Sequence, residues 1–185
     1  MDVHADAVVG RRAVPGEFRG DGAQISDNVV WENGWGYTPW GWGGGIVAST
    51  SRNVQITGNT VAWNADGIAV IEQDRGAAYT VTNVSVTQNL IAAAPSAGQS
   101  FGRAWLTDVN PDRIHAPASA NRGEQNVYWT PTPDSGSLQF GWTFDMNELS
   151  TFNATPGEEG GRYLSAGEKD QALSAKGVPL TPIAR

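Results

Sequence analysis

One recurring pattern constrains the fold of this chain more than any other feature. A strand that begins with Asn-Val, alternates apolar and polar residues and closes on a second asparagine occurs at 53–59 and again at 83–89. Such alternation predicts a β-strand buried on one face. Repeats of about 20 to 50 residues are typical of solenoids, in which each repeat forms one coil. The closing asparagines recur at intervals of 31, 30 and then 37 residues: Asn28, Asn59, Asn89 and Asn126.

Each repeat also contains a short apolar strand that follows glycine, at 45–48 in one copy and at 67–70 in the next. Because equivalent strands of successive coils are neighbours in a solenoid, we expect these two strands to pair in parallel. In the Asn-Val strands, Ile56 and Val86 should stack in adjacent coils with their side chains pointing inward.

The blocks NVQITGNTV and NVSVTQNLI resemble the repeats of right-handed parallel β-helix proteins, the pectate-lyase-like solenoids. The resemblance covers about residues 22–179 and implies coils of three short strands, with Asn59 and Asn89 laddered at an inward corner. The segments GWGYTPWGWGGGIVAS, ADGIAVIEQDRG and RYLSAGEKDQALSAKGVP are also similar to secreted bacterial β-helix proteins labelled as polysaccharide-active. The resemblance therefore implies a carbohydrate-active protein, secreted or at the cell surface. The residues themselves predict no cofactor, and a bound calcium ion is suggested only by this resemblance.

We therefore expect an all-β chain, a right-handed parallel β-helix (a single-stranded solenoid) of about four coils. The coils should occupy residues 22–144, after an unpatterned segment at 1–21 and before a helical cap and tail at 145–185. Members of the family carry further coils before the first repeat found here. An uncapped solenoid end exposes strand edges, so we expect possible self-association through that end.

The C-terminal region changes from the strand pattern to a helical one. Asp145 is expected to cap one short helix, and the Ser-Ala-Gly-Glu sequence at 165–168 is a capping box for a second. We expect both helices to close the end of the solenoid, where Leu149, Phe152 and Leu173 would cover apolar residues of the coils.

Charge and composition exclude several partners. The net charge is −7, with 12 basic against 19 acidic residues and no basic cluster, which argues against nucleic acid and anionic membrane surfaces. No apolar run approaches the roughly 20 residues of a membrane span, and the first residues show no signal peptide. The resemblance to secreted proteins instead implies an exported chain. Both indications agree if the given chain lacks its natural beginning. The absence of cysteine excludes disulfides and thiolate metal sites.

An aromatic stretch between residues 31 and 45 is the first candidate for ligand binding. Glycine and proline interrupt it throughout, so we expect a protruding loop rather than a regular element. Its rings could stack on the apolar faces of pyranose sugars. Alternatively, the loop folds back and its rings cover the side of the solenoid. The candidate substrate-binding aromatic residues are Trp35, Tyr37, Trp40 and Trp42.

The strand that begins at Asp66 and ends at Glu72-Gln73-Asp74-Arg75 carries the densest set of ionisable groups on a predicted strand. Acid/base chemistry on a glycosidic bond or a uronate needs such carboxylates, with Gln73 as a binding residue. An ordinary Asp-Gly turn and a surface ion pair would look the same. If the strand continues straight, alternation places Glu72 on the buried face, whereas a bend at Gln73 would turn it outward.

Residues 101–109 predict the corresponding strand of the next coil, with Trp105 in it and Asp108 near its end. Asp108 would extend the carboxylate row and is the fifth catalytic candidate. The two histidines, His4 and His115, are too far apart in the sequence to form a metal site, so we expect His115 to be solvated or locally bonded.

These candidates suggest a protein that binds an extended polysaccharide along one solenoid face, between the aromatic loop and the segment 72–75. It would act as a lyase or hydrolase, although the sequence leaves open whether it is an enzyme. The alternative is a non-catalytic carbohydrate-binding or adhesive module, or the remnant of a truncated enzyme.

Overall fold

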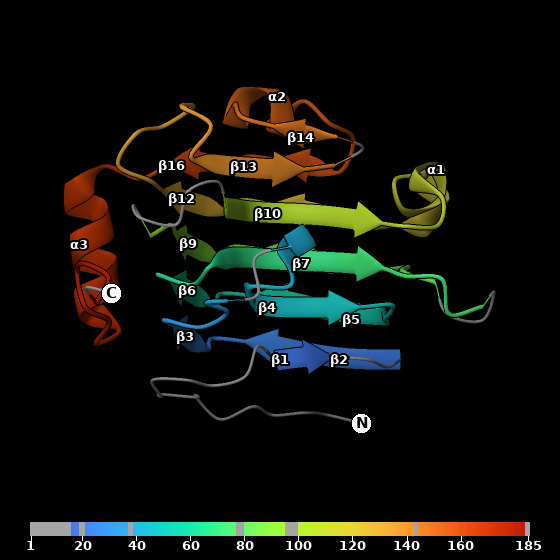
Figure 1. Cartoon of the computed structure of the whole chain (residues 1–185), viewed down its shortest axis with the longest axis horizontal. Coiled ribbons are helices and arrows are strands. Elements are labelled where there is room, and N and C mark those ends of the chain that lie inside the picture. The colour runs from blue at the N-terminus through green and yellow to red at the C-terminus, as the bar shows by residue number, and fades with distance from the viewer. Residues whose placement is uncertain are drawn as a thin grey trace.

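The computed structural model describes residues 16–18, 21–36, 39–76, 80–94, 100–142 and 144–183. They form a parallel β-solenoid of about four turns, as the repeats predicted (Figure 1). Sheet A contains β1 (Gly16–Phe18), β4 (Gly44–Ser49), β7 (Asp66–Glu72), β10 (Ser100–Thr107), β13 (Leu138–Gly141) and β14 (Asp145–Met146). Sheet B contains β2 (Asp21–Ser26), β5 (Arg52–Thr57), β8 (Ser85–Thr87), β11 (Arg122–Glu124) and β15 (Glu158–Glu159). Sheet C contains β3 (Val29–Trp31), β6 (Thr60–Ala62), β9 (Leu90–Ala92), β12 (Val127–Trp129) and β16 (Arg162–Tyr163).

Equivalent strands of successive coils pair in register. Ile46 of β4 lies opposite Ile68 of β7, which confirms the parallel pairing predicted for the two apolar strands. Ile56 lies opposite Val86, and both side chains are completely buried, so the predicted inward stack is confirmed. Residues 16–18, in the segment without a sequence repeat, form β1 and pair with β4.

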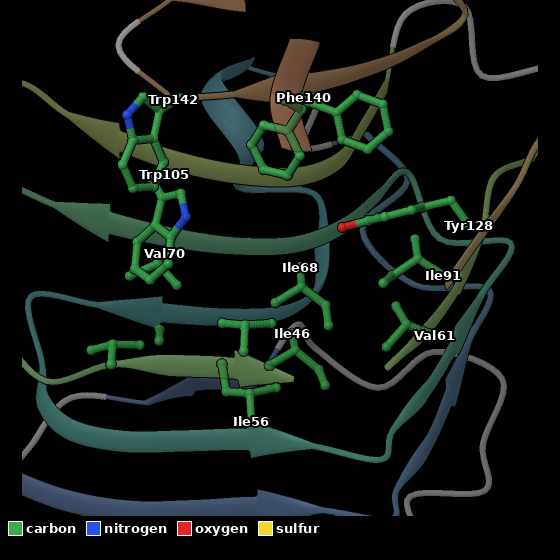
Figure 2. Packing of buried hydrophobic residues seen from close by; sticks show 14 of the residues in the cluster. Ile46, Ile56, Val61, Ile68, Val70, Ile91, Trp105, Tyr128, Phe140 and Trp142 are labelled. Carbon is green, nitrogen blue, oxygen red and sulfur yellow. The ribbon is translucent and has the colours of Figure 1, made fainter. Parts of the chain in front are cut away.

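The solenoid interior is aliphatic in its first coils and becomes aromatic toward the C-terminal end (Figure 2). Residues such as Ile46, Ile56 and Ile68 fill the lower part. Near the other end, Tyr128 packs edge-on against Phe140 with ring centroids 4.9 Å apart. Aromatic pairs of this geometry add to the stabilisation that burial alone provides.

The corner between sheets B and C carries the predicted asparagine ladder. The backbone N–H of Asn59 donates to Asn89 Oδ1 at 2.9 Å, and Asn59 Nδ2 donates to the same oxygen. Asn28 makes the same contacts with Asn59, as Asn89 does with Asn126. Each asparagine follows a residue with positive φ, such as Gly58 at 68°, so the turn is tight and its N–H groups point along the solenoid axis. The ladder is confirmed and has four rungs.

A second, shorter ladder stands at the corner between sheets C and A. Asn33 N–H donates to Asn64 Oδ1 at 2.9 Å, after the positive-φ residues Glu32 and Trp63. This ladder was not predicted from the sequence. Its only signal is the 31-residue interval between the two asparagines, which equals the interval from Asn28 to Asn59 in the first ladder.

One helix closes the C-terminal end of the solenoid. Helix α2 (Leu149–Asn153) lies above β13, and its Leu149 and Phe152 are buried in the core (Figure 1). Asp145 does not cap this helix, contrary to expectation, because residues 145–146 form β14, which pairs antiparallel with β13. The residue at the N-cap is Glu148.

The other C-terminal helix lies along the side of the solenoid. Helix α3 (Ala166–Ala175) begins with the predicted capping box of Ser165 and Glu168. It runs beside sheet C rather than over the end, because Leu173 packs onto the apolar outer face of that sheet with Trp63 (Figure 1). The predicted closure of the end therefore holds for α2 alone.

Two short helical segments lie in the loop between β10 and β11: α1 (Pro111–Ile114) and the 3-10 turn η2 (Pro117–Ser119). No helix in the described ranges is long and apolar enough to cross a membrane.

Candidate functional site

Both candidate regions lie on sheet A, on or beside strand β7. Asp66 is the first residue of β7 and Glu72 is the last. The aromatic loop leads into β4, the neighbour of β7, and the Asp66 N–H donates to the carbonyl of Gly43 at 3.0 Å. The loop therefore meets the Asp66 end of β7, as expected from chain order.

The aromatic loop lies flat on the outer face of sheet A instead of protruding. Its 3-10 turn η1 (Pro39–Gly41) approaches so closely that a Cβ on Gly41, which has φ +70°, would lie 2.9 Å from Leu106 Cδ1. Trp40 and Trp42 stay partly exposed while packing on an apolar cluster of that face: Val47, Ala69, Ile71, Ala104 and Leu106. The fold-back alternative is thus the observed one.

The other two aromatic candidates do not join this pair. Trp35 is partly buried, and its Nε1 donates to the carbonyl of Trp63 at 3.2 Å, which ties it to the corner after sheet C. Tyr37 lies outside the described residues. Only Trp40 and Trp42 are therefore placed together on sheet A.

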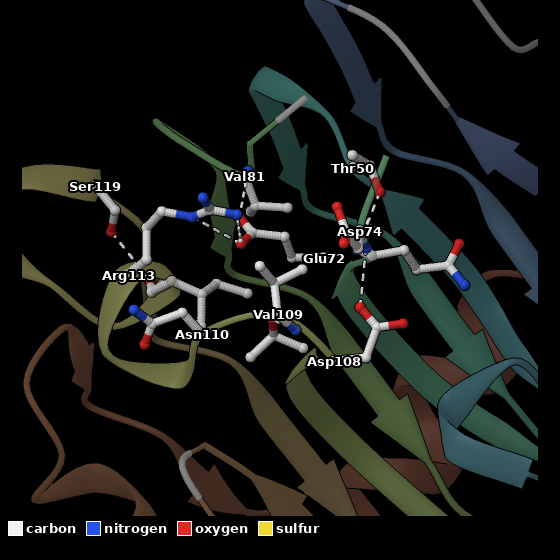
Figure 3. A network of polar contacts seen from close by, with 12 residues as sticks. Thr50, Glu72, Asp74, Val81, Asp108, Val109, Asn110, Arg113 and Ser119 are labelled. Carbon is white, nitrogen blue, oxygen red and sulfur yellow. Dashed lines mark hydrogen bonds and ion pairs between the residues drawn. The ribbon is translucent and has the colours of Figure 1, made fainter. Parts of the chain in front are cut away.

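Glu72 is buried at the corner that follows β7 (Figure 3). The strand runs straight through Glu72, whose side chain is completely buried on the inward face, as the first alternative predicted. Its Oε2 accepts from the Val81 N–H at 2.7 Å, and its Oε1 accepts from Arg113 Nε at 2.9 Å and Nη2 at 2.5 Å. Both carboxylate oxygens are therefore occupied, and the buried charge is neutralised by an arginine that the sequence analysis did not single out.

The residues after Glu72 form a partly exposed rim at the C-terminal ends of β7 and β10 in sheet A (Figure 3). The Asp74 backbone N–H donates to Asp108 Oδ1 at 3.0 Å, so these two exposed residues are neighbours on adjacent coils. The Gln73 N–H donates to Thr50 Oγ1 at 3.2 Å, and the Gln73 side chain accepts from Arg75 Nη2. The predicted carboxylate row thus contains Asp74 and Asp108, without Glu72.

Asp66 is buried at the start of β7, with 6% of its surface exposed. Its Oδ1 accepts from the Phe101 N–H at 2.9 Å, which joins two successive coils, while Oδ2 has no hydrogen-bond partner. Burial raises the pKa of this carboxyl to about 6, because desolvation outweighs the backbone hydrogen bonds that favour the charged form. The hollow beside it has no room for a water molecule.

A buried ion pair inside the solenoid was not predicted from the sequence either. Arg103 faces inward from β10, and its Nη2 lies 3.6 Å from Oε1 of Glu158 in β15, with both side chains almost completely buried. The same Oε1 accepts from Trp105 Nε1 at 2.6 Å, and the guanidinium lies over the Trp105 ring. Burial lowers the pKa of Arg103 and raises the pKa of Glu158, and the attraction between them opposes both shifts. Because both side chains of the pair are buried, we infer that the pair stabilises the fold.

Calcium binding, which only the family resemblance suggests, stays an expectation. No group of three or more histidine, aspartate or glutamate side chains gathers among the described residues. Asp74 and Asp108 alone are too few oxygen ligands for that ion. His115 packs on Trp142 with ring centroids 4.1 Å apart rather than lying in solvent, and its burial lowers its pKa.

Comparison with known proteins adds no relative to this picture. Protein-family models, curated proteins and solved structures were all searched, and none of them matches this chain.

Proposed function

We propose that this chain is a carbohydrate-binding β-solenoid that holds an extended saccharide on the outer face of sheet A without cleaving it. The observation that carries the proposal is the placement of Trp40 and Trp42, whose rings pack on sheet A yet are only partly buried. Indole rings present a large flat surface, and a sugar ring can stack on it at little cost in conformational freedom.

The rim at the far end of β7 supplies polar groups for the same ligand. Exposed Asp74 and Asp108 accept hydrogen bonds from sugar hydroxyls, as carboxylates do. Trp40 and Trp42 pack on a cluster that includes Ile71 and Leu106, close to the end of β7 that leads into the rim, so a short oligosaccharide could contact both. Stacking would supply most of the affinity and the rim would supply orientation.

Burial of two carboxylates favours binding over catalysis. Glu72 has both oxygens occupied and Asp66 is covered, so neither reaches a substrate atom. A lyase or hydrolase of the pectate-lyase-like kind remains the second candidate, and only the exposed pair Asp74 and Asp108, with Arg75, could carry its acid/base steps. Secretion or display at the cell surface belongs to the same proposal.

Affinity for a panel of soluble polysaccharides, measured by calorimetry, tests the binding proposal. Trp40→Ala and Trp42→Ala should each weaken binding about tenfold or more, which corresponds to about 1.4 kcal/mol of lost stacking. Trp31→Ala is the matched control, because Trp31 is also partly buried but lies on sheet C. Equal affinity in all three variants, or no binding to any member of the panel, would contradict the proposal.

The same panel separates binding from turnover. We expect no release of reducing ends or unsaturated products by the unmodified chain. Release that disappears in Asp74→Asn or Asp108→Asn would replace this proposal with the enzymatic one.

A further inference from the structure

The outer face of sheet A carries acidic residues beside the two tryptophans that support the proposed function. Asp74 and Asp108 lie exposed on the rim, at the C-terminal ends of β7 and β10 (Figure 3). Ile71 and Leu106, which belong to the apolar cluster under the indoles, lie only three and two residues before them in the chain. The two aspartates therefore border the aromatic surface.

A third aspartate lies on the same face, toward the C-terminal end of the solenoid. Asp145 of β14 pairs with Gly141 of β13, which in turn pairs with Ala104 of the apolar cluster. The next residue, Met146, is buried in the core. Because successive side chains of a strand point to opposite faces, the exposed Asp145 stands on the outer face. The aromatic surface thus has aspartates on two sides.

The basic side chains near this face are already engaged. Arg103 and Arg113 form ion pairs with buried glutamates. Arg75 Nη2 donates to Gln73 Oε1 on the rim. Three exposed carboxylates therefore stand against one guanidinium here, on a chain whose net charge is −7. The other basic residues in the described ranges lie in sheets B and C or in and beside helix α3: Arg52, Arg122, Arg162, Lys169 and Lys176.

The indole rings favour the same sign of ligand charge. The face of a tryptophan ring attracts cations, and this attraction adds to what stacking provides. A carboxylate or sulfate group on a sugar would instead meet aspartates of its own sign, and like charges brought together at a binding surface suppress the wrong partner.

We propose that the ligand of this face is a cationic saccharide, an oligomer of amino sugars with free ammonium groups, and that polyuronates are rejected. The inference rests on the carbohydrate-binding function proposed above and names the charge of its ligand. The apolar faces of the sugar rings stack on Trp40 and Trp42. The ammonium groups at the ring edges form charge-assisted hydrogen bonds with Asp74, Asp108 and Asp145.

Calorimetry with three oligosaccharides of equal length tests the inference: a glucosamine oligomer, its fully N-acetylated form and a galacturonate oligomer. At about pH 5.5, free carboxylates are ionised and the amino groups of the sugar are protonated. The glucosamine oligomer should bind about tenfold more tightly than the acetylated form, and the galacturonate oligomer should bind most weakly. Added salt should reduce these differences, because the charges are exposed.

A pair of double variants locates the preference. Asp74→Asn with Asp108→Asn removes two charges from the rim and keeps an acceptor for the Asp74 N–H. This variant should lose most of the preference for the glucosamine oligomer over the acetylated one. Asp27→Asn with Glu124→Gln is the matched control, since it removes two charges on or beside sheet B, and it should keep the preference.

The outcomes separate this inference from the proposed function. Equal affinity for the glucosamine and acetylated oligomers, or tighter binding of the galacturonate oligomer, would overturn the inference and leave carbohydrate binding in place. Binding of none of the three would contradict the proposed function as well. An equal loss of preference in both double variants would also overturn the inference, because net charge rather than this face would then set the preference. Tighter binding of a lysine oligomer would reassign the face to basic peptides.

Discussion

The asparagine side chains serve the backbone rather than a ligand. In the first ladder, the buried side-chain amides of Asn28, Asn59 and Asn89 each donate both to the next rung and to a backbone carbonyl, as Asn89 Nδ2 does to Asn126 Oδ1 and Ile56 O. A buried backbone group without a partner is costly, so these side chains permit a two-residue turn where two sheets meet.

Replacing Asn89 with alanine should lower the free energy of unfolding by about 2–4 kcal/mol, because the Asn59 N–H and the Ile56 carbonyl would lose buried partners. Urea denaturation measures the change. Gln55→Ala is the matched control, since Gln55 belongs to an exposed pair with Gln24 and should cost less than about 1 kcal/mol. If both variants lost similar amounts of unfolding free energy, the ladder would not be a special source of stability.

Asp66 should make stability depend on pH. Its pKa is about 6 in the folded chain against an ordinary value of 3.8, so the folded state binds the proton more tightly than the unfolded state does. The contribution of Asp66 to stability is therefore greatest at and below about pH 4 and falls as the pH rises to about 6. The loss is at most about 3 kcal/mol.

Asp66→Asn keeps an acceptor for the Phe101 N–H and removes the titration. The variant should therefore gain stability relative to the parent between pH 4 and pH 7, as measured by thermal unfolding across that range. A constant difference between the two proteins over this range would show that Asp66 does not titrate with the raised pKa.

At the scale of elements, the sequence predicts strands better than it predicts what covers them. Alternation around Ile56 and Val86 suffices for register, because a slip of one residue would turn every buried side chain outward. The flat aromatic loop depends on a contact between Gly41 and Leu106, far apart in the chain. The burial of Glu72 likewise depends on an ion pair with Arg113, from the loop that follows β10, three strands later.

Helix α3 illustrates the same limit, because its sequence shows a capping box but not the face on which it docks. Lys169 and Leu173 are its buried residues, and the Lys169 ammonium lies 4.6 Å from the Trp129 ring centroid. Cation–π contact and apolar burial together hold the helix on sheet C.

Leu173→Ala should loosen this docking and cost about 2–4 kcal/mol through lost burial and the cavity left behind. Quenching of tryptophan fluorescence by acrylamide should rise, because the helix covers Trp63 and packs beside Trp129. Gln171→Ala, an exposed position on the same helix, should leave quenching unchanged. Unaltered quenching in the Leu173 variant would mean that the helix does not protect this face.

At the scale of the whole molecule, each coil contacts mainly the coils next to it. Side-chain contacts across the interior add links between the sheets. Arg103 in β10 and Glu158 in β15 form such a link between sheets A and B. Gly123 leaves room for it, since a Cβ there would lie 2.2 Å from a Glu158 carboxylate oxygen. No local pattern predicts this pair, because its members are distant in sequence and meet only once the coils have stacked.

A double-mutant cycle tests whether the interior pair holds the last coil in place. Arg103→Met alone should cost about 3–5 kcal/mol, because it leaves the Glu158 carboxylate buried without a counter-charge. Glu158→Gln keeps an acceptor for Trp105 Nε1 and removes the charge, so adding it to Arg103→Met should recover most of that loss. Equilibrium denaturation of the four proteins gives the coupling energy. Additive losses would mean that the two charges act independently, and the link between β10 and β15 would then rest on apolar packing alone.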